Sequence, residues 1–240
     1  MSDHNRNTQD RLLAVLIDAD NIPAKFAEAI LKEITKHGKP ALRRVYGDWS
    51  SDRLTNWSKE VLNLGLVAHQ ETANTKGKNA SDIGLVIDAM DILHTGRFDG
   101  FVLVSSDSDF TALANRIREQ GLEVIGIGEA KAPESLRNVC SRFVLIENII
   151  EDPEPAKGKD APGTPAAKET IPLIIRAMEK IDTDDDWYNL GRVGQQIVAD
   201  NPDFDTRTYG HKKLSELVAE IPRFETMRGD SNQLLVRRID

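Results

Sequence analysis

Aspartates recur in this sequence where an apolar run ends or a helix begins. Two follow the apolar run at 12–17, two follow the run at 100–105, and one opens a helical pattern at 80–93. The five residues are Asp18, Asp20, Asp82, Asp107 and Asp109. If the apolar runs are parallel strands of one sheet, these carboxylates meet at its carboxyl edge. Open α/β sheets carry their working sites at that edge.

An edge of this kind suits a divalent metal ion. Carboxylates held close together raise one another's pKa unless a cation neutralises them. Mg²⁺ or Mn²⁺ does this well, because hard cations prefer carboxylate oxygens and retain several waters. A bound ion can activate a water and stabilise charge on a phosphoryl oxygen. The acids therefore predict metal-assisted phosphate chemistry.

Helix capping is the competing interpretation of each aspartate taken alone. Asp107 precedes a predicted helix that begins at Ser108, and Asp109 would favour the positive end of its dipole. Asp82 could cap its own helix, and Asp18 could cap the turn after its strand. The recurrence of acids in three separate segments favours the metal site over three independent caps.

Residues close to these acids in sequence are secondary candidates. Asn21 could cap the helix that follows it, or its amide could orient a water or a phosphate. Asp88 lies about 120° away from Asp82 around the predicted helix, so we expect it to point elsewhere. Lys76 and Lys78 precede Asp82 in a loop. They could guide a phosphate backbone into the site or be ordinary surface lysines.

The elements that must position these residues alternate along residues 1–150. The sequence predicts strands at 12–17, 41–47, 64–71, 100–105, 122–128 and 142–148. It predicts helices at 23–38, 52–64, 80–93, 108–119 and 133–140. Strands that alternate with helices, several of them apolar throughout, indicate a parallel sheet covered on both faces. The expected fold class is therefore α/β.

A second, smaller domain is expected after residue 169. Residues 151–169 contain four prolines and little large apolar surface, which is typical of a linker. The remainder, 170–240, predicts helices at 170–181, 187–200 and 206–220, then strands at 223–229 and 232–239. Three helices followed by a hairpin is the order of a winged helix, a common nucleic-acid reader.

Four basic residues of this second domain are candidates for RNA contact. They are Arg207, His211, Lys212 and Lys213. On the exposed side of a helix at 206–220 they would suit phosphate groups. With Asp203 and Asp205 nearby, a simple solvated face is the alternative.

Composition limits the other possibilities. The net charge is −8, so contact with nucleic acid must depend on local basic patches or bound metal. A single cysteine, Cys140, excludes an internal disulfide and a cysteine-based zinc site. With no apolar run of membrane-spanning length and a polar N-terminus, we expect a cytoplasmic protein without membrane contact.

Two groups of motifs resemble known families. IDADN (17–21), KGKNASDIGLVIDAM (76–90) and VLVSSDSDF (102–110), in that order, resemble the NYN domain, a branch of the PIN-like ribonuclease superfamily. This resemblance covers roughly residues 10–148. Residues 187–228 resemble a LOTUS domain, also called OST-HTH, a small winged-helix RNA-binding module. One departure from the NYN pattern is Ala80-Ser81, where that family commonly has a glycine or basic residue and a hydrophobic residue.

The resemblance implies a metal-dependent ribonuclease with a PIN-like (Rossmann-like) fold and RNA as its partner. The implied metal-binding and catalytic residues are Asp18, Asp82, Asp107 and Asp109, with Asp20, Asn21 and Asp88 secondary. The implied cofactor is Mg²⁺ or Mn²⁺, and G-rich or structured RNA is a family-level expectation. A homo-oligomer is compatible with this assignment.

Two other functions stay open at this point. The protein could bind RNA without cleaving it, with an acidic edge that holds metal weakly or not at all. It could also be a phosphatase or phosphotransferase of another doubly wound family, in which paired aspartates such as Asp18 and Asp20 follow the first strand. The lysine and threonine motifs of those phosphatases are missing from the sequence, and the RNA-like second domain argues against them.

Overall fold

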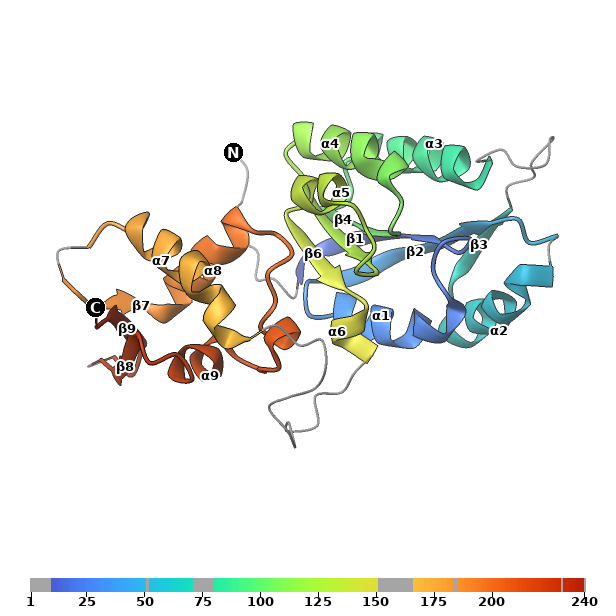
Figure 1. The fold of residues 1–240 in the computed structure, drawn as a ribbon. Coiled ribbons are helices and arrows are strands. Elements are labelled where there is room, and N and C mark those ends of the chain that lie inside the picture. Colours follow the sequence, from blue (N-terminus) through green and yellow to red (C-terminus); the bar gives the residue numbers. More distant parts are fainter. Residues whose placement is uncertain are drawn as a thin grey trace. The chain divides into compact units, whose positions relative to one another are not determined.

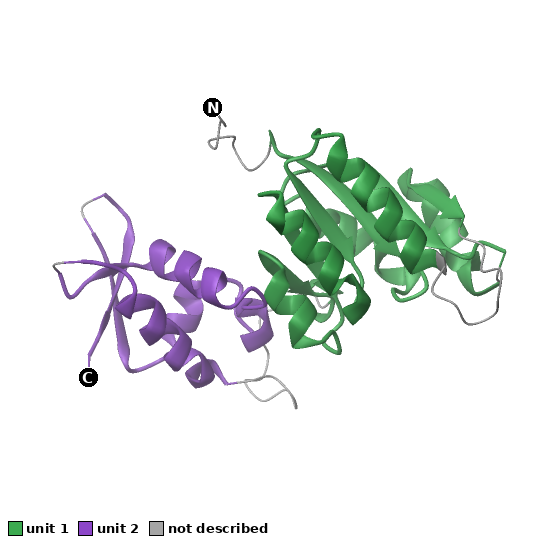
Figure 2. Ribbon diagram, turned by 90° about the horizontal axis from the view of Figure 1, so that it is seen from above, with its two compact units in different colours: residues 1–150 green, residues 151–240 purple. Residues whose placement is uncertain are grey.

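Two compact units make up the chain, and each has its own hydrophobic core. The computed structural model describes residues 10–50, 52–70, 80–150, 166–183, 185–229 and 231–239. Unit 1 is Met1–Ile150 and unit 2 is Glu151–Asp240 (Figure 2). Lys76, Lys78 and most of the expected linker lie outside the described residues.

Unit 1 is built on a six-stranded parallel sheet (Figure 1). Its strands are β1 (Leu12–Asp18), β2 (Lys39–Gly47), β3 (Val67–Gln70), β4 (Gly100–Val104), β5 (Glu123–Gly128) and β6 (Arg142–Leu145). They lie in the order β3-β2-β1-β4-β5-β6, and every neighbouring pair is parallel. The predicted α/β fold with a parallel sheet is confirmed.

Helices cover both faces of this sheet (Figure 1). One face carries α1 (Ala27–Ile34), α2 (Thr55–Leu64) and α6 (Glu147–Ile150). The other carries α3 (Ala80–His94), α4 (Thr111–Glu119) and α5 (Glu134–Val139). Along β1, Leu13, Val15 and Ile17 pack in the first core, whereas Ala14 and Leu16 pack in the second. A strand buried on both sides must be apolar throughout, which explains the run at 12–17.

The strand order sets the position of the site. Strands β1 and β4 are neighbours in the middle of the sheet. After β1 the chain passes to α1 on one face, and after β4 it passes to α4 on the other. The loops that leave these two strands therefore diverge, which is the arrangement that places the working site of an open α/β sheet at its carboxyl edge.

Unit 2 combines helices with a three-stranded antiparallel sheet of order β7-β9-β8. Its elements are α7 (Ile171–Glu179), β7 (Tyr188–Asn189), α8 (Leu190–Asp200), α9 (Leu214–Ala219), β8 (Phe224–Arg228) and β9 (Leu234–Arg238). Val193, Ile197, Leu217 and Val236 are fully buried in its core. Helices followed by a hairpin is the expected winged-helix order.

Two of the helix predictions in unit 2 are wrong in extent. The helix predicted at 187–200 begins only at Leu190, because Tyr188 and Asn189 form β7 and pair with β9. The helix predicted at 206–220 is broken: a 3₁₀ turn at Thr206–Tyr209 ends at Gly210, whose φ is +77°. The α-helix resumes at Leu214, so the expected basic helix face is a turn and a connecting loop.

Other boundaries in the described residues differ by a few positions. Strand β3 is shorter than the run at 64–71, and β6 ends at Leu145 before a short helix. Among the described residues, no helix has both the length and the apolar character needed to cross a membrane.

Candidate functional site

Asp18 is the last residue of β1 and lies at the centre of the carboxyl edge. Its side chain is buried, with 3% of the residue exposed. One carboxylate oxygen, Oδ1, accepts hydrogen bonds from the backbone N–H groups of Asp20 and Asn21, both at 3.2 Å. The other, Oδ2, accepts from the Ser105 hydroxyl at 2.9 Å. Asp18 therefore fixes its own loop and joins it to the end of β4.

Asn21 makes a second connection between the same loops. Its side-chain oxygen accepts a hydrogen bond of 2.9 Å from the backbone N–H of Ser106. The Ser106 hydroxyl in turn accepts from the N–H of Glu129, just after β5, at 2.8 Å. The loops after β1, β4 and β5 are thus tied together. The capping role considered for Asn21 is not seen, since Pro23 precedes the first helical turn.

Asp107 and Asp109 lie just before α4. The Asp107 carboxylate accepts a 2.9 Å hydrogen bond from the N–H of Asp109 and so caps the 3₁₀ turn at Ser108–Phe110. The N–H of Asp107 donates to the Ser105 hydroxyl at 3.1 Å. Capping by Asp107 is therefore real, and it fixes the position of that carboxylate at the sheet edge.

The first turn of α3 reaches the same place. The hydroxyl of Ser81 donates a 2.9 Å hydrogen bond to the carboxylate of Asp20. This contact anchors the start of α3 to the loop after β1, and Asp82 is the next residue. Ser81 belongs to the Ala80-Ser81 departure noted in the sequence, so that departure supplies a cross-loop contact. Nothing in the local sequence around Ser81 indicated this partner.

The carboxylates are close enough to affect each other's ionisation. The pKa of Asp18 is raised to about 7, mainly by burial and also by the charges of Asp82 and Asp20, against the hydrogen bonds from Ser105 and Asn21. Burial also raises the pKa of Asp82, and the charges of Asp107, Asp109 and Asp20 add to that rise. Acids from three segments distant in sequence therefore share one electrostatic environment.

The donor set can be compared with the needs of a divalent cation. Within the described residues, no three carboxylate, imidazole or thiol side chains are close enough together to form a ready-made metal cage. Mg²⁺ does not require one, because it is commonly held by one or two carboxylates and several waters. The oxygen donors, and the raised pKa values of Asp18 and Asp82, fit such an ion, which would relieve the repulsion among the carboxylates.

Asp88 faces a different part of the structure. Its carboxylate accepts hydrogen bonds from the Arg44 guanidinium and the Tyr46 hydroxyl, both on β2. The imidazole of His69 lies 3.9 Å from the same carboxylate. Asp88 therefore anchors α3 to the sheet, in agreement with the expectation that it points away from Asp82.

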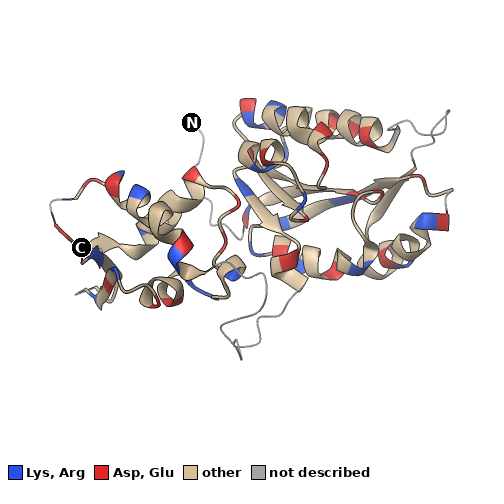
Figure 3. Ribbon diagram, in the orientation of Figure 1, with Lys and Arg blue, Asp and Glu red and all other residues tan. Residues whose placement is uncertain are grey.

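The four basic candidates of unit 2 are arranged unequally. Lys212 and Lys213 are exposed, and Lys213 directly precedes α9. Arg207 is held by Asp205 at 2.6 Å, and His211 lies 3.3 Å from Glu220. Acidic and basic positions are interspersed over the helices of both units (Figure 3).

Sequence reasoning missed two serines whose contacts organise the edge. Ser105 and Ser106 form hydrogen bonds with Asp18, Asn21 and Glu129. Both serines are buried, with 4% and 6% exposed. Their position between a buried strand and two acids was the available signal, but their partners depend on the strand order.

Two family models match the chain. Residues 12–147 match the NYN domain, and residues 165–236 match the OST-HTH/LOTUS domain. Together the two domains indicate an RNA-related function. A search of curated proteins found no match.

Solved structures include a protein of unknown function from Vibrio parahaemolyticus with the same fold. It is 19% identical, has a TM-score of 0.50, and the alignment covers 62% of this chain and 98% of that one. MurG from Acinetobacter baumannii is 13% identical, with a TM-score of 0.38 and coverage of 88% and 69%. By the match over most of unit 1, the chain belongs to the NYN domain family, a PIN-like fold, and carries an OST-HTH/LOTUS domain after it.

Proposed function

We propose that unit 1 is a divalent-metal-dependent ribonuclease that hydrolyses RNA phosphodiesters. One observation carries the proposal: acids from three segments lie at one sheet edge. There, burial and the charges of Asp107, Asp109 and Asp20 raise the pKa of Asp82, and burial and the charge of Asp82 raise that of Asp18. Acids brought together in this way need a cation, and a cation at such an edge suits phosphate chemistry. The NYN match supports the same reaction class.

The roles of the residues follow from their positions. Asp18, Asp82, Asp107 and Asp109 would hold Mg²⁺ or Mn²⁺. When bound, the ion supplies activation of a water and stabilisation of phosphoryl charge. Ser105 and the N–H groups of the β1 loop fix the orientation of Asp18. Because Asp20 accepts from Ser81, it holds the start of α3 in place.

Unit 2 has the role of an RNA tether in this proposal. The OST-HTH/LOTUS match supports RNA binding, and Lys212 and Lys213 are exposed cations that suit phosphate groups. A tethered RNA reaches the acidic edge at a higher effective concentration than a free one. G-rich and structured RNAs are the substrates to test first.

Cleavage by an Asp107→Asn variant tests the assignment. The asparagine keeps an oxygen that can accept from Asp109, so the helix cap and the fold should persist. Purified protein is incubated with mixed RNA and Mn²⁺, with and without chelator. We expect the variant to lose activity by about 100-fold or more, as expected when a group essential to the reaction is removed. A folded variant that cleaves at the wild-type rate would exclude Asp107 from catalysis.

A non-catalytic RNA-binding protein is the second candidate. It is favoured by the absence of a three-ligand metal cage within the described part of the chain. Calorimetric titration with Mn²⁺ separates the two functions. Binding that is lost in the Asp107→Asn variant supports the ribonuclease, and no binding at millimolar metal supports the second candidate.

A further inference from the structure

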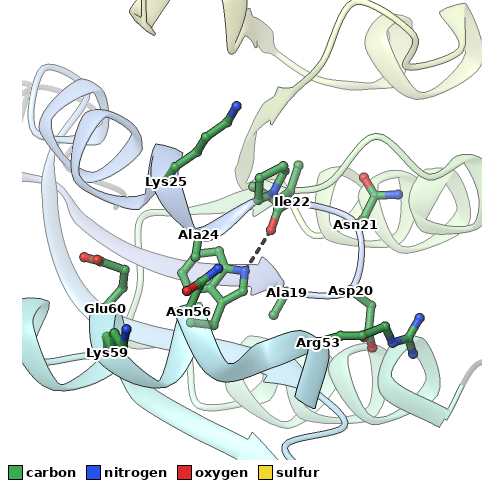
Figure 4. Close-up of a pocket in the computed structure, with 12 residues that line it drawn as sticks. Ala19, Asp20, Asn21, Ile22, Ala24, Lys25, Arg53, Asn56, Lys59 and Glu60 are labelled. Carbon is green, nitrogen blue, oxygen red and sulfur yellow. Dashed lines mark hydrogen bonds between the residues drawn. The ribbon is translucent and has the colours of Figure 1, made fainter. Parts of the chain in front are cut away.

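A cleft opens beside the acidic edge of unit 1. One wall is the segment from Ala19 to Lys25, after β1, and the other is formed by α2 and the 3₁₀ turn before it, including Arg53 and Asn56 (Figure 4). Its volume is about 510 Å³. Sites for single small ligands typically have about 300–1,000 Å³, which suits one nucleotide of a single strand and is too small for a duplex.

The floor of the cleft is already rigid. The indole N–H of Trp57 donates a 2.7 Å hydrogen bond to the carbonyl oxygen of Ile22, across the two walls. Trp57 and Ile22 are 2% and 1% exposed, and both belong to the core beneath. A ligand would therefore meet a formed surface, and little of its binding energy would be used to order the protein.

The cleft is continuous with the acids. Asp20 and Asn21 line it, and both donate their backbone N–H to the carboxylate of Asp18. Arg53 and Asp20 lie at the same end of the cleft (Figure 4). A polymer with one nucleotide in the cleft would therefore have its neighbouring phosphate at the carboxylates.

The lining matches the parts of a nucleotide. Arg53, in the 3₁₀ turn before α2, and Lys59, on α2, are exposed cations, and a guanidinium can bind a phosphate through two parallel hydrogen bonds. Asn56 is exposed between them and offers both a donor and an acceptor, the pair needed for a base edge. Pro23, which is exposed in the lining, offers an apolar surface suited to a base or sugar.

We propose that this cleft binds the nucleotide next to the scissile phosphate of a single-stranded RNA. Arg53 holds the phosphate adjacent to the one that is cleaved, and Asn56 contacts the base. Residues 53–60 thus act in positioning the substrate, not in the chemical step. This inference rests on the proposed ribonuclease function, which it extends by naming the form of the substrate and its subsite.

Photo-crosslinking and kinetics test the subsite in the full chain. The binding probe is a ten-nucleotide single-stranded RNA carrying 4-thiouridine, crosslinked to Asp107→Asn protein so that no cleavage occurs. Mass spectrometry should place crosslinks in residues 19–25 or 53–60. Arg53→Ala should reduce them and, in the active enzyme, raise KM about tenfold with kcat nearly unchanged, the loss expected for one charged phosphate contact. Arg116→Ala, a matched change on α4 across the sheet, should alter neither.

The possible results distinguish a failure of the proposed subsite from a failure of the proposed ribonuclease activity. Suppose that wild-type protein cleaves RNA, that Arg53→Ala behaves like Arg116→Ala, and that crosslinks lie only outside residues 19–25 and 53–60. The proposed subsite is then wrong, and the proposed ribonuclease activity stands. If crosslinks lie in the cleft and depend on Arg53 but the wild type cleaves nothing, the subsite stands as a binding site and the ribonuclease is wrong.

Discussion

Asp18 holds a carboxylate at the buried end of a central strand, where ionisation is costly without a cation. Burial raises its pKa to about 7, and the neighbouring acids Asp82 and Asp20 act in the same direction. Three hydrogen bonds partly offset this cost and keep the side chain oriented. The ionised carboxylate of Asp18 therefore suits a bound cation, and without one it lowers the stability of the folded protein.

The stability of metal-free protein should depend on pH through Asp18. Because its pKa rises from 3.8 to about 7 on folding, its stabilising contribution is complete below pH 4 and is lost as pH rises through 7. Asn at this position does not titrate. We expect Asp18→Asn to gain stability relative to wild type between pH 5 and pH 8, by about 1–3 kcal/mol.

Urea denaturation in chelator at the two pH values measures this difference. Added Mn²⁺ should then stabilise the wild type and leave Asp18→Asn unchanged. A variant whose stability relative to wild type is the same at pH 5 and pH 8 would show that Asp18 is not perturbed by folding.

The acids could be predicted at the residue scale, but their partners could not. Asp18, Asp82 and Asp107 follow apolar runs or open a helix, so the sequence alone indicates a shared edge. The bonds from Ser105 to Asp18 and from Ser81 to Asp20 join positions 87 and 61 residues apart. Such pairs depend on which strands are neighbours, and no local pattern specifies that.

At the scale of elements, close packing between strand ends keeps the site in shape. Gly128 ends β5 beside the loop that follows β4. A Cβ atom at this position would lie 2.6 Å from the carbonyl oxygen of Ser105 and 3.0 Å from the hydroxyl of Ser106. Any larger residue must therefore displace the two serines that hold Asp18 and Asn21.

We expect Gly128→Ala to weaken both stability and cleavage. Overpacking of this kind costs about 1–3 kcal/mol. The displaced Ser105 would also release Asp18 and lower the cleavage rate. Gly96→Ala is the comparison: Gly96 has a φ of +62° and open space around it, after α3 at the opposite end of the sheet. That variant should lose stability through backbone strain and keep its cleavage rate per folded molecule, as measured by urea unfolding and RNA assays. Equal rates in both variants would contradict the proposed coupling.

Element predictions succeeded where local sequence decides the structure. The strands β1 and β4 are buried on both faces, so their sequences are apolar throughout and predict strands without further information. The helix predicted at 187–200 includes Tyr188 and Asn189. These residues instead pair with Val236 and Leu235, which are distant in sequence, so the local pattern could not indicate a strand. Gly210 was a visible signal for the break in the predicted third helix, since only glycine adopts its left-handed backbone readily.

At the scale of the whole molecule, the two units have separate cores and are expected to fold independently. Their functions should therefore be separable. Removing residues 151–240 should raise KM for long RNA several-fold, because the tether is lost, and leave kcat nearly unchanged. Steady-state cleavage of long and ten-nucleotide RNAs by the two proteins measures this. An unchanged KM for long RNA would show that unit 2 does not tether the substrate.

Cleavage of a labelled RNA in Mn²⁺ by Asp82→Asn, compared with wild type, tests the central claim most directly. Asp82 lies in the first turn of α3 at the acidic edge. Burial raises its pKa, and the charges of three other acids raise it further. Asp88→Asn is the matched control, because Asp88 lies on the same helix but bonds to Arg44 and Tyr46. We predict a loss of about 100-fold or more for Asp82→Asn, and a rate within a few-fold of wild type for Asp88→Asn. Equal activity of the folded Asp82→Asn variant and wild type would contradict a metal-dependent site at this edge.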